Sequence, residues 1–196
     1  MGTRTAVPSV NAGSMADIAF LLLIFFLVTT SIETDTGLDR LLPRLEPGPI
    51  KDVNDRNILL VTINKDNELL VDDEQIELSQ LKHTTATFLD NGGVMEKCRY
   101  CQGPRLNYGS DNPQDAVVLL KSDRATSYGT YIVVQNELVA AYSILRNREA
   151  QRLFDQDYNS LEAAYNDPST TVPERNRLKS KIKQIQALYP LNLIEQ

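Results

Sequence analysis

The sequence predicts an α+β protein in which a single N-terminal transmembrane helix and a flexible linker precede a small α/β-layered domain with a helical-hairpin extension. An unbroken apolar run, a segment rich in proline and glycine, and short β-rich runs alternating with helical patterns predict this arrangement. The 196 residues suffice for one ordinary domain with appendages. We divide the chain into a tail (1–11), a transmembrane helix (12–32), a linker (33–56) and a folded domain (57–196).

Composition excludes several functional classes. Lysine and arginine number 20 against 26 aspartates and glutamates, and the resulting charge of −6 argues against general binding to nucleic acid. A single histidine and two cysteines rule out a polyhistidine metal site and a disulfide-rich scaffold. The chain carries no nucleophile elbow, phosphate-binding loop or dinucleotide-binding glycine pattern. We therefore expect neither an enzyme nor a bound metal or cofactor.

The apolar run IAFLLLIFFLV covers 18–28, and its extension to 12–32 contains one charge, that of Asp17. At 1.5 Å per residue this span measures about 31 Å, which matches the hydrocarbon core of a bilayer. A cleaved signal peptide is disfavoured by the early carboxylate and by the lack of a small-residue cleavage site. A buried core helix is disfavoured because the run is apolar all round. The basic residues that flank the span leave its orientation open: Arg4, Arg40, Arg44 and Lys51.

Asp17 is the informative residue of the predicted span. A carboxylate in the hydrocarbon zone is costly, so it usually faces a protein interior or a water cavity. Gly13 and Ser14 lie four and three positions before it and form a small-residue patch for close helix packing, and Leu21 continues the same face. No basic residue of the span can neutralise Asp17, which therefore needs a proton or another chain. Alternatively, Asp17 lies at the membrane interface and helps to cap the helix.

The linker is predicted from its prolines and glycines, and the folded domain from a series of short patterns. We expect strands at 57–64 and 69–71, a helix at 78–89, a strand at 116–120, a long helix from 127 to about 166, a helix from a capping box at Thr171–Glu174 to 188, and a closing strand at 191–194. An insertion covers about 91–114, and a helical extension covers 150–188. The acidic run 72–74 is expected to form a solvated turn.

The pair Cys98-x-x-Cys101 has three possible chemistries: a disulfide, a redox-active thiol pair, or half of a zinc site. No second pair with this spacing exists, and His83 is the only imidazole, so zinc would need ligands from another chain. Neighbouring glycines and a proline place the pair in a loop, where a disulfide would staple the insertion. Farther along, Asp123 and Arg124 are expected to pair locally at the start of the long helix.

Two separated segments resemble the ExbD/TolR family of biopolymer-transport proteins. The first is Val7-Pro-Ser-Val-Asn11 with Asp17 and the run LLLIFFLVTT; the second is Ala116-Val-Val-Leu-Leu-Lys-Ser-Asp-Arg124 followed by Ser127-Tyr-Gly-Thr130. Departures from the family pattern are Ala12–Ala16 before the aspartate, the cysteine-containing insertion, and the length of the helix after Tyr128.

This resemblance implies a single-pass protein of the bacterial inner membrane, with its N-terminus in the cytoplasm and its folded domain in the periplasm. Two copies of the helix would sit in a pore made by a multi-span ExbB/TolQ-like subunit, and Asp17 would translocate protons to energise outer-membrane transport through a TonB- or TolA-like transducer. The resemblance also makes Asp123, Arg124 and Tyr128 possible partner contacts. Three alternatives stay open: a TolR-like envelope-maintenance subunit, a tethered structural adaptor without proton transfer, and a thiol-redox protein.

Overall fold

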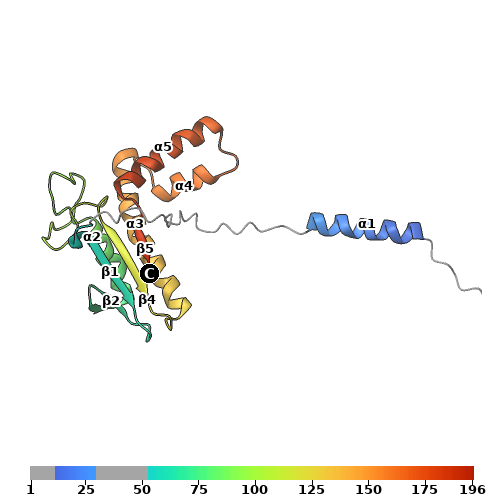
Figure 1. Ribbon diagram of the computed structural model, residues 1–196. Coiled ribbons are helices and arrows are strands. Elements are labelled where there is room, and N and C mark those ends of the chain that lie inside the picture. The colour runs from blue at the N-terminus through green and yellow to red at the C-terminus, as the bar shows by residue number, and fades with distance from the viewer. Residues whose placement is uncertain (1–11, 30–52) are drawn as a thin grey trace, which may run out of the picture. The chain divides into compact units, whose positions relative to one another are not determined.

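The computed structural model describes residues 12–29 and 53–196 (Figure 1). The chain divides into two compact units, 1–44 and 45–196, and each is considered by itself. The predicted tail, the last three residues of the predicted span and nearly all of the predicted linker lie outside the described residues.

The N-terminal unit contains helix α1, Ala12–Thr29, whose 18 residues are all exposed. Its length of about 27 Å follows from the rise per residue. Among the described residues α1 is the one helix long and apolar enough to cross a membrane. In the last turn of α1, the Thr29 hydroxyl donates a hydrogen bond to the carbonyl oxygen of Phe25 at 2.7 Å. A helix that exposes an apolar surface on all sides, interrupted by one charge, is suited to a lipid environment.

The folded unit is built on a five-stranded sheet with the order β3-β2-β1-β4-β5. The strands are β1 (Ile58–Ile63), β2 (Leu69–Val71), β3 (Glu74–Ile76), β4 (Val117–Ser122) and β5 (Leu193–Glu195). Strands β1, β4 and β5 are parallel, whereas β1–β2 and β2–β3 are antiparallel hairpins. The prediction missed β3, because the acidic turn comprises only Asp72 and Asp73 and Glu74 already begins a strand.

Two helices cover one face of this sheet: α2 (Leu78–Leu89), which matches its predicted bounds, and α3 (Tyr128–Phe154) (Figure 1). Alternate side chains of β1 and β4 point towards these helices and are buried, as the period of a strand requires. The core contains Leu59, Val61, Ile63, Val118, Leu120, Leu81, Leu89, Leu138 and Tyr142, each at most 3% exposed. This layer therefore fixes how α2 and α3 lie against the strands.

The predicted single helix from 127 to about 166 is wrong. Helix α3 ends at Phe154, where Asp155 adopts a left-handed conformation with φ of 53°. A second helix, α4 (Tyr158–Asn166), begins at Asp157, whose carboxylate accepts a hydrogen bond from the Ser160 amide at 3.1 Å. The apolar spacing continues across this break, and no glycine or proline interrupts it, so periodicity alone predicts one continuous helix.

Helix α4 pairs with α5 (Val172–Leu188) to form a helical hairpin with its own small core. That core consists of Ala150, Tyr158, Leu161, Ile182 and Ile185. Thr171 is the N-cap of α5, but its side chain makes no capping hydrogen bond, so the predicted capping box is absent. Pro173 occupies the first turn instead, where its missing N–H costs nothing and its fixed φ favours the helix.

The segment between α2 and β4 contains neither helix nor strand and is organised by buried side chains. Asn91 donates to the carbonyl oxygens of Leu106 at 3.0 Å and Ser110 at 2.9 Å, and its own side-chain oxygen accepts from the Leu106 amide at 2.7 Å. Asn57, in the short 3₁₀ helix Asp55–Asn57, accepts from the Asp111 amide at 2.7 Å. These bonds satisfy buried backbone groups that regular secondary structure would otherwise pair.

Candidate functional site

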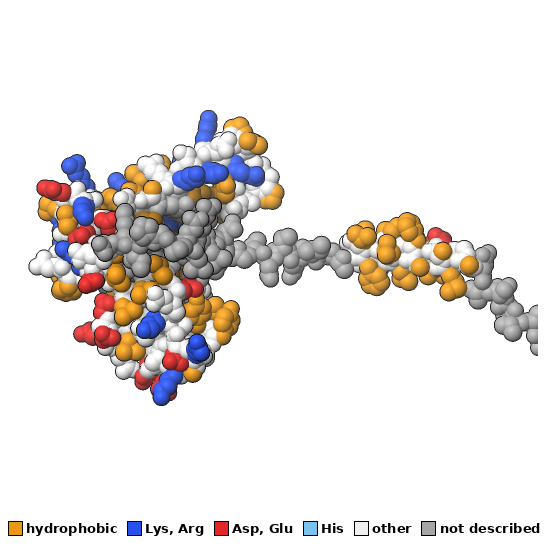
Figure 2. Space-filling model, viewed as in Figure 1, with side chains coloured by type: hydrophobic (Ala, Val, Ile, Leu, Met, Phe, Trp, Pro, Cys, Tyr) orange, Lys and Arg blue, Asp and Glu red, His pale blue; other side chains and the backbone are white. Residues whose placement is uncertain are grey.

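Asp17 carries the only charge on α1, as its sixth residue. Figure 2 shows hydrophobic side chains along the whole of α1 and a single acidic group near one end. Because α1 has no basic residue, no side chain of its own helix can neutralise the carboxylate. In a hydrocarbon environment such a group must be protonated, hydrated or paired with another chain.

The face of α1 that surrounds Asp17 is uneven in size. Helical geometry places Gly13 and Ser14 one turn before Asp17 and Leu21 one turn after it. The small side chains allow another helix to approach closely on the N-terminal side of the carboxylate, whereas Leu21 fills space on the other side. The arrangement is suited to a carboxylate at a helix–helix contact.

The connection from β4 to α3 holds Asp123 and Arg124, and α3 begins at Tyr128; all three side chains are exposed. Asp123 forms a turn, because its carboxylate accepts from the Ala125 amide at 2.8 Å and its own amide donates to the Ile63 carbonyl oxygen at 3.1 Å. The predicted pairing of Asp123 with Arg124 is wrong, since no ion pair joins them in this described connection. Helix α3 begins instead from Ser127, whose hydroxyl oxygen accepts from the Thr130 amide at 3.2 Å.

Tyr128 is 77% exposed on the first turn of α3, beside Gly129, around which the space is open. A large, rigid aromatic side chain at such a position contributes little to the core and is available to a partner. Arg124 likewise stands in solvent. The structure thus gives Asp123 a local structural role and leaves the other two side chains accessible.

The two cysteines of the insertion form a disulfide, and both are almost completely buried. The loop packs closely against α2's end: a side chain at Gly92 would place its Cβ 2.6 Å from the Cβ of Cys101. Gly92 also has φ of +60°, a conformation that glycine adopts without strain. The disulfide therefore belongs to a tightly packed structural loop.

Tyr100, between the two cysteines, connects this loop to the end of α5. Its hydroxyl donates to the Leu188 carbonyl oxygen at 2.9 Å, and its ring meets that of Tyr189 edge to face with centroids 5.6 Å apart. Burial, followed by the negative charges of Glu149 and Asp90, raises the pKa of Tyr100 to about 12. Its hydroxyl is therefore protonated and able to donate throughout the neutral range.

A polar cluster built around the buried carboxylates of Asp90 and Glu149 joins the ends of α2, α3 and α5. Arg148 donates to both carboxylate oxygens of Asp90, at 2.6 and 2.8 Å, and the Tyr189 hydroxyl donates to the same carboxylate at 2.6 Å. The hydrogen bond to Asp90 raises the pKa of Arg148, and burial, followed by the same carboxylate, raises the pKa of Tyr189. The neighbouring Glu149 is fully buried and accepts from Arg152 at 2.7 Å and Arg148 at 3.3 Å.

We call these five residues, Asp90, Arg148, Glu149, Arg152 and Tyr189, the junction cluster. Sequence reasoning missed it, although one signal was present. Glu149 follows Leu145 by four residues on the buried stripe of α3, where a carboxylate requires a buried cation. Nothing in the sequence identified Asp90 and Tyr189 as neighbours of Arg148, since they lie 58 and 41 residues away along the chain.

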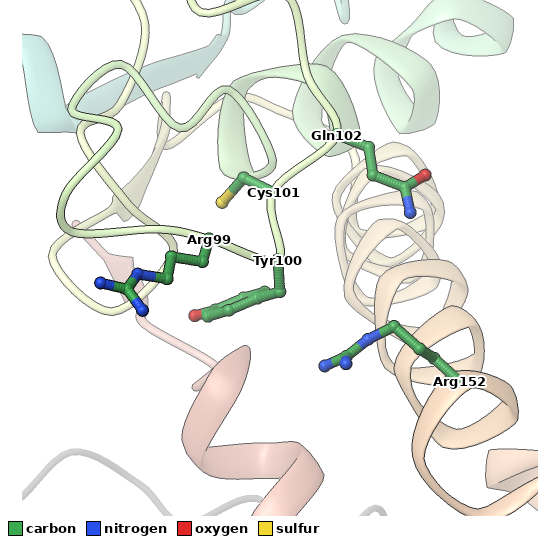
Figure 3. Close-up of a pocket in the computed structure, with 5 residues that line it drawn as sticks. All are labelled: Arg99, Tyr100, Cys101, Gln102 and Arg152. Atoms are coloured by element: carbon green, nitrogen blue, oxygen red, sulfur yellow. The ribbon is translucent and has the colours of Figure 1, made fainter.

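A pocket of about 360 Å³ lies beside the disulfide (Figure 3). It is lined by Arg99, Tyr100, Cys101, Gln102 and Arg152, and the Tyr100 ring lies between the two arginines. Arg152 is already engaged by Glu149, and the Cys101 sulfur is in the disulfide. These groups supply neither a nucleophile nor a general base at neutral pH. Among the described residues no group of three metal-ligating side chains comes together.

Removal of the disulfide between Cys98 and Cys101 should lower the stability of the folded domain measurably. We expect the double variant Cys98→Ser, Cys101→Ser to lose about 2 kcal/mol of stability, because only two residues lie inside the closed loop and the entropic gain of a short loop is small. Urea unfolding of the full chain, followed by far-ultraviolet circular dichroism, would measure the loss. Reduction of the wild type should produce the same change, and equal stability of the oxidised and reduced proteins would contradict the prediction.

Comparison with protein-family models finds one family. The model described as biopolymer transport protein ExbD/TolR matches residues 4–146, which include α1, the sheet up to β4 and most of α3. The match ends before α4, α5 and β5. No individually curated protein matches the chain.

Proposed function

Because the chain belongs to the ExbD/TolR family of biopolymer transport proteins, we propose that it is the single-pass subunit of an inner-membrane motor driven by the proton-motive force. The family itself establishes a role in biopolymer transport. The observation that carries the finer proposal is Asp17, the only charge on a helix that is otherwise apolar and exposed.

Proton exchange at Asp17 would couple ion flow to movement. The neutral and charged forms of a carboxylate favour different surroundings in a membrane, so each proton taken up or released changes which surface of a surrounding pore the helix prefers. The residues Gly13, Ser14 and Leu21 support close packing around that carboxylate. We propose that a multi-span ExbB/TolQ-like subunit provides the surrounding surface and that two copies of the helix share it.

We further propose that the N-terminus is cytoplasmic and that the folded domain acts in the periplasm, where it contacts a TonB- or TolA-like transducer. The disulfide supports this location, because such bonds persist in oxidising compartments. Arg124 and Tyr128 are candidate contacts, since both are exposed on the β4–α3 connection. Of the two roles within the family, we propose the ExbD-like one, which energises outer-membrane transport.

The proposal is tested by replacing residues 12–32 with an unrelated polyleucine anchor. We expect the chimera to enter the membrane but to lose energised transport completely, because an anchor without Asp17 cannot exchange protons. The measurement is substrate uptake by cells that express the chimera in place of the natural chain, with the amount of membrane-inserted protein determined by blotting.

A matched chimera that restores Gly13, Ser14 and Asp17 within the polyleucine anchor, where position 21 is already leucine, is the control, and it should recover part of the uptake. Full uptake with the plain anchor would instead show a tethered adaptor that takes no part in proton flow. The double variant Cys98→Ser, Cys101→Ser, which leaves α1 intact, tests the alternative of a thiol-redox protein. Activity that survives this double replacement would eliminate that alternative.

A further inference from the structure

A groove of about 540 Å³ lies between α2 and the half of the sheet formed by β1, β2 and β3. Apolar side chains from the sheet and the helix line it: Leu59, Val71, Ile76 and Phe88. Thr84 and Thr87 of α2 form the helical wall, and the exposed ring of Tyr108 stands at one end. We call this feature the β3–α2 groove. The functional site described above uses none of these residues.

The rim of the groove is negatively charged. Asp72 and Glu74 line it, and Asp73 lies between them at the apex of the β2–β3 hairpin. None of these three carboxylates forms an ion pair within the described part of the chain, and no lysine or arginine lines the groove. The imidazole of His83 is its only basic side chain. An occupant with positive charges would relieve the repulsion between the carboxylates.

The backbone conformation and the charge of the hairpin apex do not favour the stability of the folded domain. Asp72 and Asp73 both adopt left-handed conformations, with φ of 48° and 67°. Tight hairpins of this kind favour Asn-Gly or Asp-Gly, because a side chain at positive φ costs roughly 1 kcal/mol. Two adjacent carboxylates add mutual repulsion. Only one of them has an evident structural use: Asp72 accepts from the Leu60 amide at 3.0 Å.

Strand β3 borders the same groove and is an edge strand of the sheet. Among the described residues it pairs with β2 alone, so its outer edge offers backbone donors and acceptors to an incoming strand. The side chains of an added strand alternate between its two faces. Glu74 and Ile76 lie two residues apart on β3 and both line the groove, so the groove-facing side chains of an added strand would meet the carboxylate at one end and the apolar lining beyond it.

We propose that the β3–α2 groove binds an extended segment of a partner protein that presents lysine or arginine and apolar residues at every second position, on one face of the added strand. The apolar residues fill the groove beside Phe88 and Thr87, and the basic residues meet Asp73 and Glu74. With three residues in β3, the paired stretch is short, about 10 Å. The inference deepens the proposed function and rests on it only in assuming that the folded domain has a protein partner.

The test uses a fluorescent heptapeptide in which lysine and valine occupy every second position with serine between them, and the full chain in nanodiscs of zwitterionic lipid, to which the peptide has no charge attraction. Fluorescence anisotropy gives the dissociation constant. Thr87→Trp fills the groove and should weaken binding about tenfold or more. The double variant Asp73→Asn, Glu74→Gln keeps side-chain size and should weaken binding about fivefold, with a smaller dependence on salt.

Ser180→Trp, on the exposed side of α5, is the matched control and should leave binding unchanged. Equal binding by Thr87→Trp and the control would overturn the proposal, as would equal affinity for a peptide of the same composition whose lysines lie on one face of the strand and whose valines lie on the other. Self-association of the chain that Thr87→Trp abolishes would identify a second copy as the occupant and also overturn it. Asp17→Asn should leave peptide binding intact, so failure of the groove and failure of the proton motor are distinguishable.

Discussion

Replacement of Asp17 by asparagine is expected to abolish transport driven by the proton-motive force. Asparagine keeps the size and hydrogen-bonding shape of the carboxylic acid but cannot take up or release a proton. We expect the variant to enter the membrane and to assemble with a multi-span partner as the wild type does. Co-purification would report assembly, and proton flux into liposomes that contain both subunits would fall to the level without this chain.

Three further variants make the Asp17 result specific. Asp17→Glu keeps the ionisable group and should retain part of the flux, although its longer side chain shifts the carboxylate. Ser14→Ala and Leu21→Ala alter the neighbouring packing without touching the charge, and each should retain most of the flux. Loss of assembly in Asp17→Asn would indicate a structural carboxylate. Flux at the wild-type level would show that Asp17 does not carry protons.

The second large effect is expected at the junction cluster, where Arg148→Ala should lower the free energy of unfolding by about 3–5 kcal/mol. The change leaves Asp90, whose side chain is 8% exposed, without its bidentate cation, and removes one of the two cations beside the fully buried Glu149. An unpaired buried charge costs far more than a lost surface contact. Urea unfolding of the full chain would measure the difference.

Arg124→Ala is the matched control for this prediction, because it removes an exposed arginine that forms no ion pair among the described residues. Its effect should stay within about 0.5 kcal/mol. The double variant Asp90→Asn, Arg148→Met removes both charges of the pair and should recover part of the loss. A loss below about 1 kcal/mol in Arg148→Ala would show that water satisfies Asp90 and Glu149.

The extension beyond the matched family region depends on the same junction. Tyr189 links the end of α5 to Asp90, and Tyr100 holds the preceding carbonyl group through the disulfide loop. Strand β5 follows within a few residues and pairs in parallel with β4. The insertion and the extension thus support each other, and together they fix the last strand of the sheet.

Sequence patterns were sufficient wherever local chemistry decides the structure. Helix α1 follows from an apolar run longer than any strand, and α2 from an apolar stripe that ends at Asn91-Gly-Gly93. Strands β1 and β4 follow from their β-branched and aliphatic residues. Asp17 was identifiable because a charge inside such a run is costly whatever surrounds it.

Sequence patterns failed where the structure depends on contacts between distant residues, and where one pattern fits two local structures. The apolar spacing across Asp155 fits one helix or two, and the packing of α4 on α5 favours two. The capping box at Thr171 matched in sequence, yet the helix formed without it. Strand β3 is only three residues long, and its pairing with β2 rather than its composition makes it a strand.

By itself, then, the sequence determined the apolar N-terminal helix with its single carboxylate, the class of the folded domain and the family to which the chain belongs. Those features depend on runs of neighbouring residues, whose hydrophobicity and spacing act locally. Only the tertiary structure brought Asp90, Arg148 and Tyr189 together and formed the β3–α2 groove beside the acidic hairpin. Such sites arise from residues far apart in the chain, which meet because burial of the common core brings their elements together.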